Sequence, residues 1–251
     1  MDKDLVLTEI RDGDRVITLN RPDSLNSFNR SVHTALNAAL DDAEADTKCR
    51  ALILTGAGRG FCAGQDLSEV EFTPGQKPDL TVTLEKNYNP LIRRLRKLPL
   101  PIICAVNGVA AGGGANIAFA CDIVLAARSA KFIQAFSKIA LVPDCGGTWF
   151  LPRLAGNARA RALAMLAEPV SAEQAEAWGM IWKTVDAMLF AVMTESSRRP
   201  RIAVCSPIAM PHDVPDAMTG SATFTNRFEI SRSVAKSSPG FTRSFLSKTA
   251  R

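Results

Sequence analysis

The sequence predicts an α/β protein with a largely parallel sheet. Apolar runs typical of buried strands alternate along the chain with segments whose apolar residues recur at helical spacing. A chain of 251 residues is long enough to bury a sizeable core without disulfide bonds. Its mixture of hydrophobic and charged residues is that of an ordinary soluble globular protein.

The predicted elements begin with a β-hairpin and a helix. Residues 5–9 and 15–20 alternate apolar and polar side chains like the two strands of a hairpin, with Asp12 and Gly13 at the turn. Residues 29–45 then carry apolar side chains at helical spacing, which predicts the first helix.

The middle of the chain continues the alternation of strands and helices. An apolar run at 51–55 predicts a buried strand, and a helix pattern over 79–98 follows until Pro99 and Pro101 end it. The elements expected next are a strand at 102–106, a helix at 115–120 and a strand at 122–126. Helices interposed between strands in this way favour parallel pairing of the strands.

The C-terminal region divides into a regular part and an atypical tail. Helices predicted at 158–167 and 172–178 complete a core domain of residues 1–186. Over residues 187–251 the periodicity thins, and prolines interrupt any helix at positions 200, 207, 211, 215 and 239. Two interpretations stay open, a divergent or disordered extension and translation from a shifted reading frame, which the abrupt change of composition favours.

The net charge of +5 lies in this tail. From residue 187 onward there are nine basic and four acidic residues, which leaves 21 of each in residues 1–186 out of the totals of 30 and 25. The core domain is therefore neutral, and its charge does not indicate a nucleic-acid partner.

Cofactor and membrane signals are missing from the sequence. The six cysteines include no CxxC pair and there are two histidines, so no metal site is expected and free buried thiols are. The glycines at 58–63 match a loose dinucleotide fingerprint but do not open a helix directly. The chain has no apolar run of about 20 residues and no secretory signal at its start, which predicts a cytoplasmic protein without a membrane partner.

The strongest functional feature is a run of three glycines that is followed, about thirty residues later, by a single acidic residue. Gly112, Gly113 and Gly114 follow the predicted strand at 102–106 and precede a helix. Amides at a helix N-terminus lack intrahelical partners and can hold an oxyanion. Asp144, about thirty residues later, is the only carboxylate between residues 122 and 168. An oxyanion site beside an isolated acid indicates proton transfer next to a carbonyl group.

The segment that contains the glycine run and Asp144 resembles the crotonase (enoyl-CoA hydratase/isomerase) superfamily, as do several further motifs. The resemblance covers about residues 5–186. The further motifs are LNRP at 19–22, GAGRGF at 56–61, FCAGQDL at 61–67 and SAEQA at 171–175. The resemblance is strongest to the branch that isomerises the ring epoxide of phenylacetyl-CoA. It implies a spiral of repeated ββα units with a C-terminal helical region, an acyl-CoA substrate, no further cofactor, and a homotrimer or hexamer.

The resemblance also implies roles for individual residues. The backbone amides of Gln65 and Gly113 would form the oxyanion hole, and Asp144 would carry the proton. Asn116 and Phe136 stand where the family's hydratases have two glutamates, which opposes hydration and places both residues in the substrate pocket. Residue by residue, simpler roles stay open: tight turns for the glycines, a helix N-cap for Asp144, core packing for Phe136 and satisfaction of a buried backbone group for Asn116.

The expected function is an acyl-CoA isomerase. The favoured reaction converts ring-1,2-epoxyphenylacetyl-CoA to its oxepin form, with Δ3 to Δ2 enoyl-CoA isomerisation as a related capacity. Enoyl-CoA hydratase is the alternative within the same class. An inactive scaffold of this fold, or an RNA-binding relative, is the alternative from another class.

Overall fold

The computed structural model describes residues 4–11, 13–69 and 80–186. Asp12 of the predicted hairpin turn and the predicted tail, residues 187–251, lie outside the described residues.

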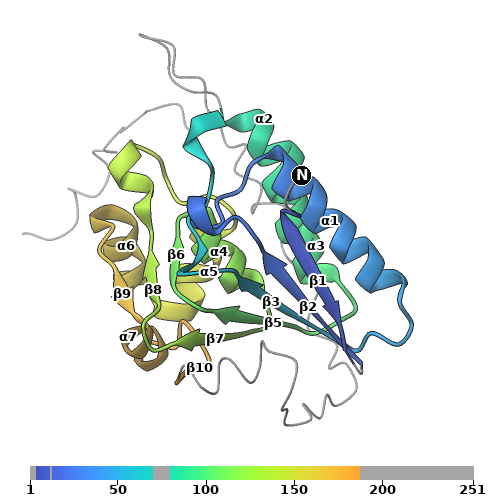
Figure 1. The fold of residues 1–251 in the computed structure, drawn as a ribbon. Coiled ribbons are helices and arrows are strands. Elements are labelled where there is room, and N and C mark those ends of the chain that lie inside the picture. The colour runs from blue at the N-terminus through green and yellow to red at the C-terminus, as the bar shows by residue number, and fades with distance from the viewer. Residues whose placement is uncertain (1–3, 12, 70–79, 187–251) are drawn as a thin grey trace, which may run out of the picture. The chain divides into compact units, whose positions relative to one another are not determined.

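A six-stranded sheet contains all five strands that the sequence predicts, together with one further strand, Lys183–Val185, which it does not predict (Figure 1). Its order is β1 (Val6–Ile10), β2 (Asp14–Leu19), β3 (Ala51–Gly56), β5 (Ile102–Val106), β7 (Ile123–Ala127) and β10 (Lys183–Val185). Only β1 and β2 pair antiparallel, as the predicted hairpin, with Ile10 opposite Arg15 at its turn. The other neighbours are parallel, which confirms the predicted sheet type.

A second sheet of four strands was not predicted by the element patterns. Its order is β4 (Gly60–Cys62), β6 (Val109–Ala111), β8 (Lys131–Ile133) and β9 (Val170–Ser171). The first three are parallel, and β9 pairs antiparallel to β8. Strands of two or three residues are too short to show a period of two, so sequence periodicity cannot find them.

Most of the helices follow pairs of strands. They are α1 (Arg30–Ala45), α2 (Thr81–Thr83), α3 (Asn89–Lys97), α4 (Gly113–Ala120), α5 (Gly147–Ala155), α6 (Asn157–Leu166) and α7 (Ala172–Ala177). From β3 to α5 the chain repeats one unit: a strand of the large sheet, a strand of the small sheet, then helical structure. This is the repeated ββα arrangement expected from the resemblance.

Two predicted helices differ in detail from the structure. The helix expected over 79–98 is interrupted by a π-helical turn, Leu84–Tyr88, immediately before α3. Pro90 has no N–H to donate and its ring crowds the carbonyl of Lys86, so regular hydrogen bonding cannot continue through this turn. The helix expected at 115–120 begins earlier, at Gly113, so the second and third glycines of the run are helical.

The large sheet packs its helices against one face. Alternate residues of its strands, such as Leu52 and Leu54, join the main core with residues of α1 and α3, whereas Ile53 and Ile103 belong to a separate small cluster. α1 and α3 lie side by side (Figure 1), and Arg94 of α3 bonds to three residues of α1. This core fixes the strands whose ends carry the candidate site.

Candidate active site

The candidate site is formed where three neighbouring parallel strands of the small sheet end. Residues 63–65 follow β4, Gly112 and Gly113 follow β6, and residues 134–136 follow β8. Carboxyl ends of parallel strands meet at one edge of a sheet, which is where open α/β sheets bind ligands. The unpredicted small sheet therefore gathers the glycine motifs that lie far apart in the sequence.

The turns after β4 and β6 touch each other. A Cβ atom on Gly64 would lie 2.9 Å from the carbonyl oxygen of Ala111 and 3.2 Å from the amide nitrogen of Gly113. Gly64 has φ +88° and Gly112 has φ 52° with ψ −126°, conformations that suit glycine alone. Close approach and backbone conformation together explain why both turns need glycine.

The amide of Gln65 faces away from its neighbouring segment. Phe28 forms a parallel bridge with Gln65, in which the Phe28 amide donates to Gly64 O (2.7 Å) and its carbonyl accepts from Asp66 N (2.8 Å). In such a bridge the N–H of the central residue points to the opposite side. Within the described ranges, the Gln65 N–H has no backbone acceptor.

Gly113 supplies a second amide of the same kind. It is the first residue of α4, so its N–H has no intrahelical acceptor and lies at the positive end of the helix dipole. In the described part of the chain, no backbone carbonyl accepts this N–H. A Cβ on Gly64 would crowd the Gly113 nitrogen, so the two amide-bearing turns lie close together. Their role as an oxyanion hole stays a prediction.

Asp144 lies beside Gly113. Its Oδ1 atom is 3.8 Å from the position that a Cβ on Gly113 would occupy. The main-chain carbonyl of Asp144 accepts hydrogen bonds from Gly147 N (2.8 Å) and from Asn116 Nδ2 (2.8 Å). Oδ1 itself is buried and has no hydrogen-bond partner among the described residues. The backbone of Asp144 is thus anchored, while Oδ1 of its carboxyl group has no partner in the described part of the chain.

The environment of Asp144 favours its protonated form. Burial raises the pKa of the carboxyl group from 3.8 to about 6, and interactions with the Cys145 thiol and the backbone offset part of this increase. A carboxyl group with a pKa near neutrality can both accept and return a proton.

The N-cap role considered for Asp144 does not match the structure. Gly146 is the N-cap of α5, and no side chain caps this helix. Cys145 and Gly146 both have positive φ, 49° and 77°, which turns the chain sharply between Asp144 and the helix. Such a conformation is uncommon for a residue other than glycine, and strained backbone often accompanies functional sites.

Asn116 and Phe136, the two predicted pocket residues, adjoin the site in different ways. Asn116 is fully buried, donates to Asp144 O and accepts from Gln134 Nε2 at 2.9 Å. Its amide therefore satisfies buried groups, one of the two roles left open by the sequence. Phe136 is also buried, and its Cζ atom is 3.7 Å from the Cβ position of Gly112. Contact of either residue with a substrate stays a prediction.

Comparison with known proteins identifies the relatives of this arrangement. The family model "Enoyl-CoA hydratase/isomerase" matches residues 9–207. The chain belongs to the enoyl-CoA hydratase/isomerase family. It is 59% identical over 184 residues to the "1,2-epoxyphenylacetyl-CoA isomerase" of Escherichia coli (strain K12), covering 73% of this chain and 70% of that protein.

Further relatives bear hydratase names. The chain is 48% identical over 177 residues to the "Probable enoyl-CoA hydratase" of Rhodobacter capsulatus, covering 70% of this chain and 67% of the relative. The crystal structure of an enoyl-CoA hydratase from Thermoplasma volcanium superimposes with a TM-score of 0.68 at 31% identity, covering 75% of each chain. The expected crotonase fold is confirmed by this likeness.

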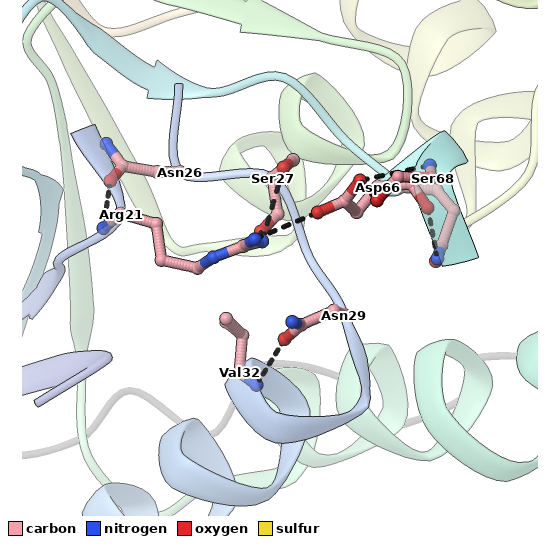
Figure 2. Close-up of polar contacts among 8 residues, drawn as sticks. Arg21, Asn26, Ser27, Asn29, Val32, Asp66 and Ser68 are labelled. Atoms are coloured by element: carbon pink, nitrogen blue, oxygen red, sulfur yellow. Dashed lines mark hydrogen bonds and ion pairs between the residues drawn. The ribbon is translucent and has the colours of Figure 1, made fainter. Parts of the chain in front are cut away.

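In this member of the enoyl-CoA hydratase/isomerase family, an ion pair braces the Gln65 turn. Figure 2 shows the guanidinium of Arg21 directed at Asp66, with Nη2 2.9 Å from Oδ2, while Nη1 donates to Ser27 O at 2.7 Å. Asp66 also accepts from the amide and hydroxyl of Ser68, which with Arg21 lowers the pKa of its carboxyl group. The sequence reasoning assigned no role to Arg21, although the LNRP motif contains it.

The sequence reasoning also missed an aromatic cluster next to Gly113. Tyr88 packs edge-on against His33, with ring centroids 4.5 Å apart, and a Cβ on Gly113 would lie 3.5 Å from Tyr88 Cε1. The hydroxyl of Tyr88 is buried without a hydrogen-bond partner in the described residues. An isolated aromatic residue in a helical segment gives no sequence signal for such a position.

The prediction of free buried thiols is confirmed for the described residues. No group of three or more His, Cys, Asp or Glu side chains in them could hold a metal ion. The five cysteines in these ranges are free and buried, as expected, and Cys205 lies outside them. Among the helices of the described part, none combines the length and the apolarity needed to cross a membrane.

Proposed function

We propose that the protein is an acyl-CoA isomerase that moves one proton within the acyl group of a CoA thioester. The thioester oxygen binds between the amides of Gln65 and Gly113. Asp144 is the base and then the acid. The observation that carries this proposal is the carboxyl group of Asp144, which lies next to Gly113, has a pKa of about 6 and has no partner at Oδ1 among the described residues.

The chemistry balances with this single carboxylate. Asp144 takes a proton from the carbon beside the thioester, the C–H electron pair moves into an enolate, and the two amides hold the negative oxygen. Asp144 then returns the proton to another carbon of the conjugated system, and the electrons of the enolate form the new C–H bond. With the ring epoxide, the C1–C2 bond of the ring opens first by electrocyclic valence isomerisation, in which its electron pair becomes a ring π bond and the seven-membered oxepin forms. Asp144 then moves the proton from the α-carbon to a ring carbon. The carboxylate and the two amides supply the proton transfer and the charge stabilisation of this step, so we propose that no further cofactor takes part.

The proposed substrate is ring-1,2-epoxyphenylacetyl-CoA, converted to its oxepin form in phenylacetate catabolism, with Δ3 to Δ2 enoyl-CoA isomerisation as a related capacity. The name of the E. coli relative, at 59% identity, supports this choice. Hydration would also need a group to position and activate water. Asn116 and Phe136, at the two glutamate positions of hydratases, can neither accept nor deliver a proton usefully, so hydratase is the less favoured alternative.

We also propose the assembly and location expected from the family resemblance. These are a homotrimer or hexamer in the cytoplasm. Sedimentation velocity of the full chain would give the oligomeric state directly. A monomer at all protein concentrations would contradict the proposed assembly and leave the chemistry of the site unaffected.

Turnover of a 3-enoyl-CoA by the wild type and by Asp144→Asn tests the function. The wild type should convert it to the 2-enoyl isomer, and the variant should lose about 10²- to 10⁴-fold in rate, because an amide cannot carry the proton. Affinity for the CoA ester should stay nearly constant. Asp42→Asn, an equal change at an exposed position on α1, is the control. A wild type without turnover, or a fully active Asp144→Asn, would refute the proposal.

A further inference from the structure

Two of the described residues that have a buried, unpartnered polar atom, Tyr88 and Asp144, lie next to Gly113. Among the described residues, such atoms include Gln65 Oε1, Tyr88 Oη and Asp144 Oδ1, and both ring nitrogens of His33. An unsatisfied buried polar atom typically destabilises a protein by about 1–3 kcal/mol, so a cluster of them marks a place prepared for a ligand. Asp144 has a role in the proposed reaction, whereas Tyr88 has none.

The position of Tyr88 puts its hydroxyl end on the side of Gly113 that faces Asp144. Tyr88 Cε1, the ring carbon next to the one that carries the hydroxyl, and Asp144 Oδ1 lie 3.5 Å and 3.8 Å from the same Cβ position of Gly113. Gly64, which leads into the Gln65 turn, instead approaches the Gly113 nitrogen. In the proposed binding mode, the two amides hold the thioester oxygen and the acyl group lies beside Asp144 and Tyr88.

The surroundings of Tyr88 fix the ring and leave the hydroxyl unbonded. His33 and Phe28 pack against the ring with centroids 4.5 Å and 6.1 Å away. Burial lowers the pKa of His33 to about 4, so the imidazole is neutral, and neither of its nitrogens bonds to the tyrosine. Burial, together with the nearby Cys145, Cys62, Asp144 and Asp66, raises the pKa of Tyr88, which keeps the hydroxyl a proton donor.

We infer that the Tyr88 hydroxyl is a specificity-determining donor for an oxygen atom carried on the acyl group of the substrate. This inference rests on the proposed function and narrows its substrate class. The preferred substrates are thioesters whose acyl ring bears an ether, epoxide or hydroxyl oxygen close to the α-carbon. Acyl groups that have no oxygen atom besides the thioester carbonyl leave the Tyr88 hydroxyl unpaired. Sites built to hydrogen-bond a substrate oxygen discriminate against analogues that lack it.

Binding of a matched ligand pair to the full chain tests the inference without turnover. Phenylacetyl-CoA and 2-hydroxyphenylacetyl-CoA differ by one ring oxygen. The wild type should bind the hydroxylated ester more tightly, and Tyr88→Phe should reduce that preference by about 3- to 10-fold, the size of one hydrogen bond. The affinity of Tyr88→Phe for phenylacetyl-CoA should be unchanged. If Tyr88→Phe loses the same affinity for both ligands, or loses affinity for neither, the inference is wrong.

Spectroscopy can observe the same contact, because Tyr88 is the only tyrosine in the chain. Protein labelled with ¹³C at the tyrosine Cζ should give one resonance that moves with 2-hydroxyphenylacetyl-CoA and stays near its free position with phenylacetyl-CoA. Identical spectra with the two ligands would contradict the inference. The Tm of Tyr88→Phe should be equal to or above that of the wild type, since the removed hydroxyl has no described partner.

The proposed function fails separately from this inference. If the wild type does not isomerise a 3-enoyl-CoA but the ligand pair behaves as expected, the catalytic proposal is wrong and the oxygen contact stands. If turnover occurs and Tyr88→Phe treats both ligands like the wild type, the inference is wrong and the isomerase stands.

Discussion

Asn116 Nδ2 donates a 2.8 Å hydrogen bond to the main-chain carbonyl of Asp144. Asn116 lies on α4, the helix that begins at Gly113, so this bond ties the acid to the helix that carries one of the two amides. Gln134, which follows β8, donates to the other end of the same side chain at 2.9 Å. A buried amide thus connects three segments of the site and fixes where the carboxyl group stands.

Asn116→Asp should loosen this connection. The change keeps the size of the side chain but removes the donor to Asp144 O and places a charge in a fully buried position. We expect the free energy of unfolding to fall by about 1–3 kcal/mol at pH 7, with a lower kcat because Asp144 is displaced. Chemical denaturation and steady-state kinetics on a 3-enoyl-CoA measure both effects.

Asn37→Asp is the matched control for this variant. Asn37 also donates its amide to a main-chain carbonyl, that of His33, but on the partly buried face of α1. Its kcat should equal that of the wild type. If Asn116→Asp also keeps the wild-type kcat, the hydrogen bond to Asp144 has no part in placing the acid.

The rate should rise with pH through the pKa of Asp144. The proposed reaction starts with the carboxylate form, and burial raises the pKa from 3.8 to about 6. The pH profile of kcat/KM reports ionisations of the free enzyme, so its acidic limb should have a midpoint near 6. The ionic strength is held constant across the series. A midpoint close to 4 would mean that the carboxyl group is solvated in solution or that another group is the base.

Asp144→Asn should stabilise the protein at neutral pH while it removes activity. Because the folded-state pKa is raised, the folded protein holds the proton more tightly than the unfolded chain, and stability falls as pH rises from 3.8 through about 6. A shift of this size corresponds to about 3 kcal/mol above pH 6. The variant carries an uncharged amide at this position, so its stability does not fall over this pH range for that reason.

The stabilisation should therefore depend on pH. Denaturant unfolding of Asp144→Asn and the wild type at pH 7.5 should differ by about 1–3 kcal/mol in favour of the variant, and the difference should shrink towards pH 4. A variant that is equally stable at both pH values would show that the carboxylate is not penalised by burial. Asp42→Asn, at an exposed position, should show no such trend.

Much of this architecture can be read from the sequence, for reasons that individual residues make plain. α1 is predictable because its apolar residues recur at helical spacing and Asn29 caps it, accepting from Val32 N at 2.9 Å. Asp144 is noticeable because the sequence around it contains no other acid. Both signals depend only on residues close together in the sequence, so they can be recognised without knowledge of the fold.

The remainder depends on contacts between distant segments. Tyr88 lies next to Gly113 because α3, which follows Tyr88, packs against α4. The strands that precede these helices in the small sheet are too short for any periodic pattern. The π-helical turn that contains Tyr88 results from Pro90 inside a helix pattern that otherwise looks continuous. Arg21 reaches Asp66 across 45 positions, so only the folded chain reveals that it supports the Gln65 turn.

Arg21→Lys should lower kcat through that turn. The guanidinium donates to Ser27 O and to Asp66 at the same time, and a single ammonium group cannot reproduce this fork. Loss of one oxyanion donor costs about 10²- to 10³-fold, so a displaced Gln65 amide should reduce kcat by less than that, with KM little changed. Arg94→Lys is the control, since Arg94 also bonds a carbonyl and carboxylates, but on α1. If the two variants lose kcat equally, the brace does not act through Gln65.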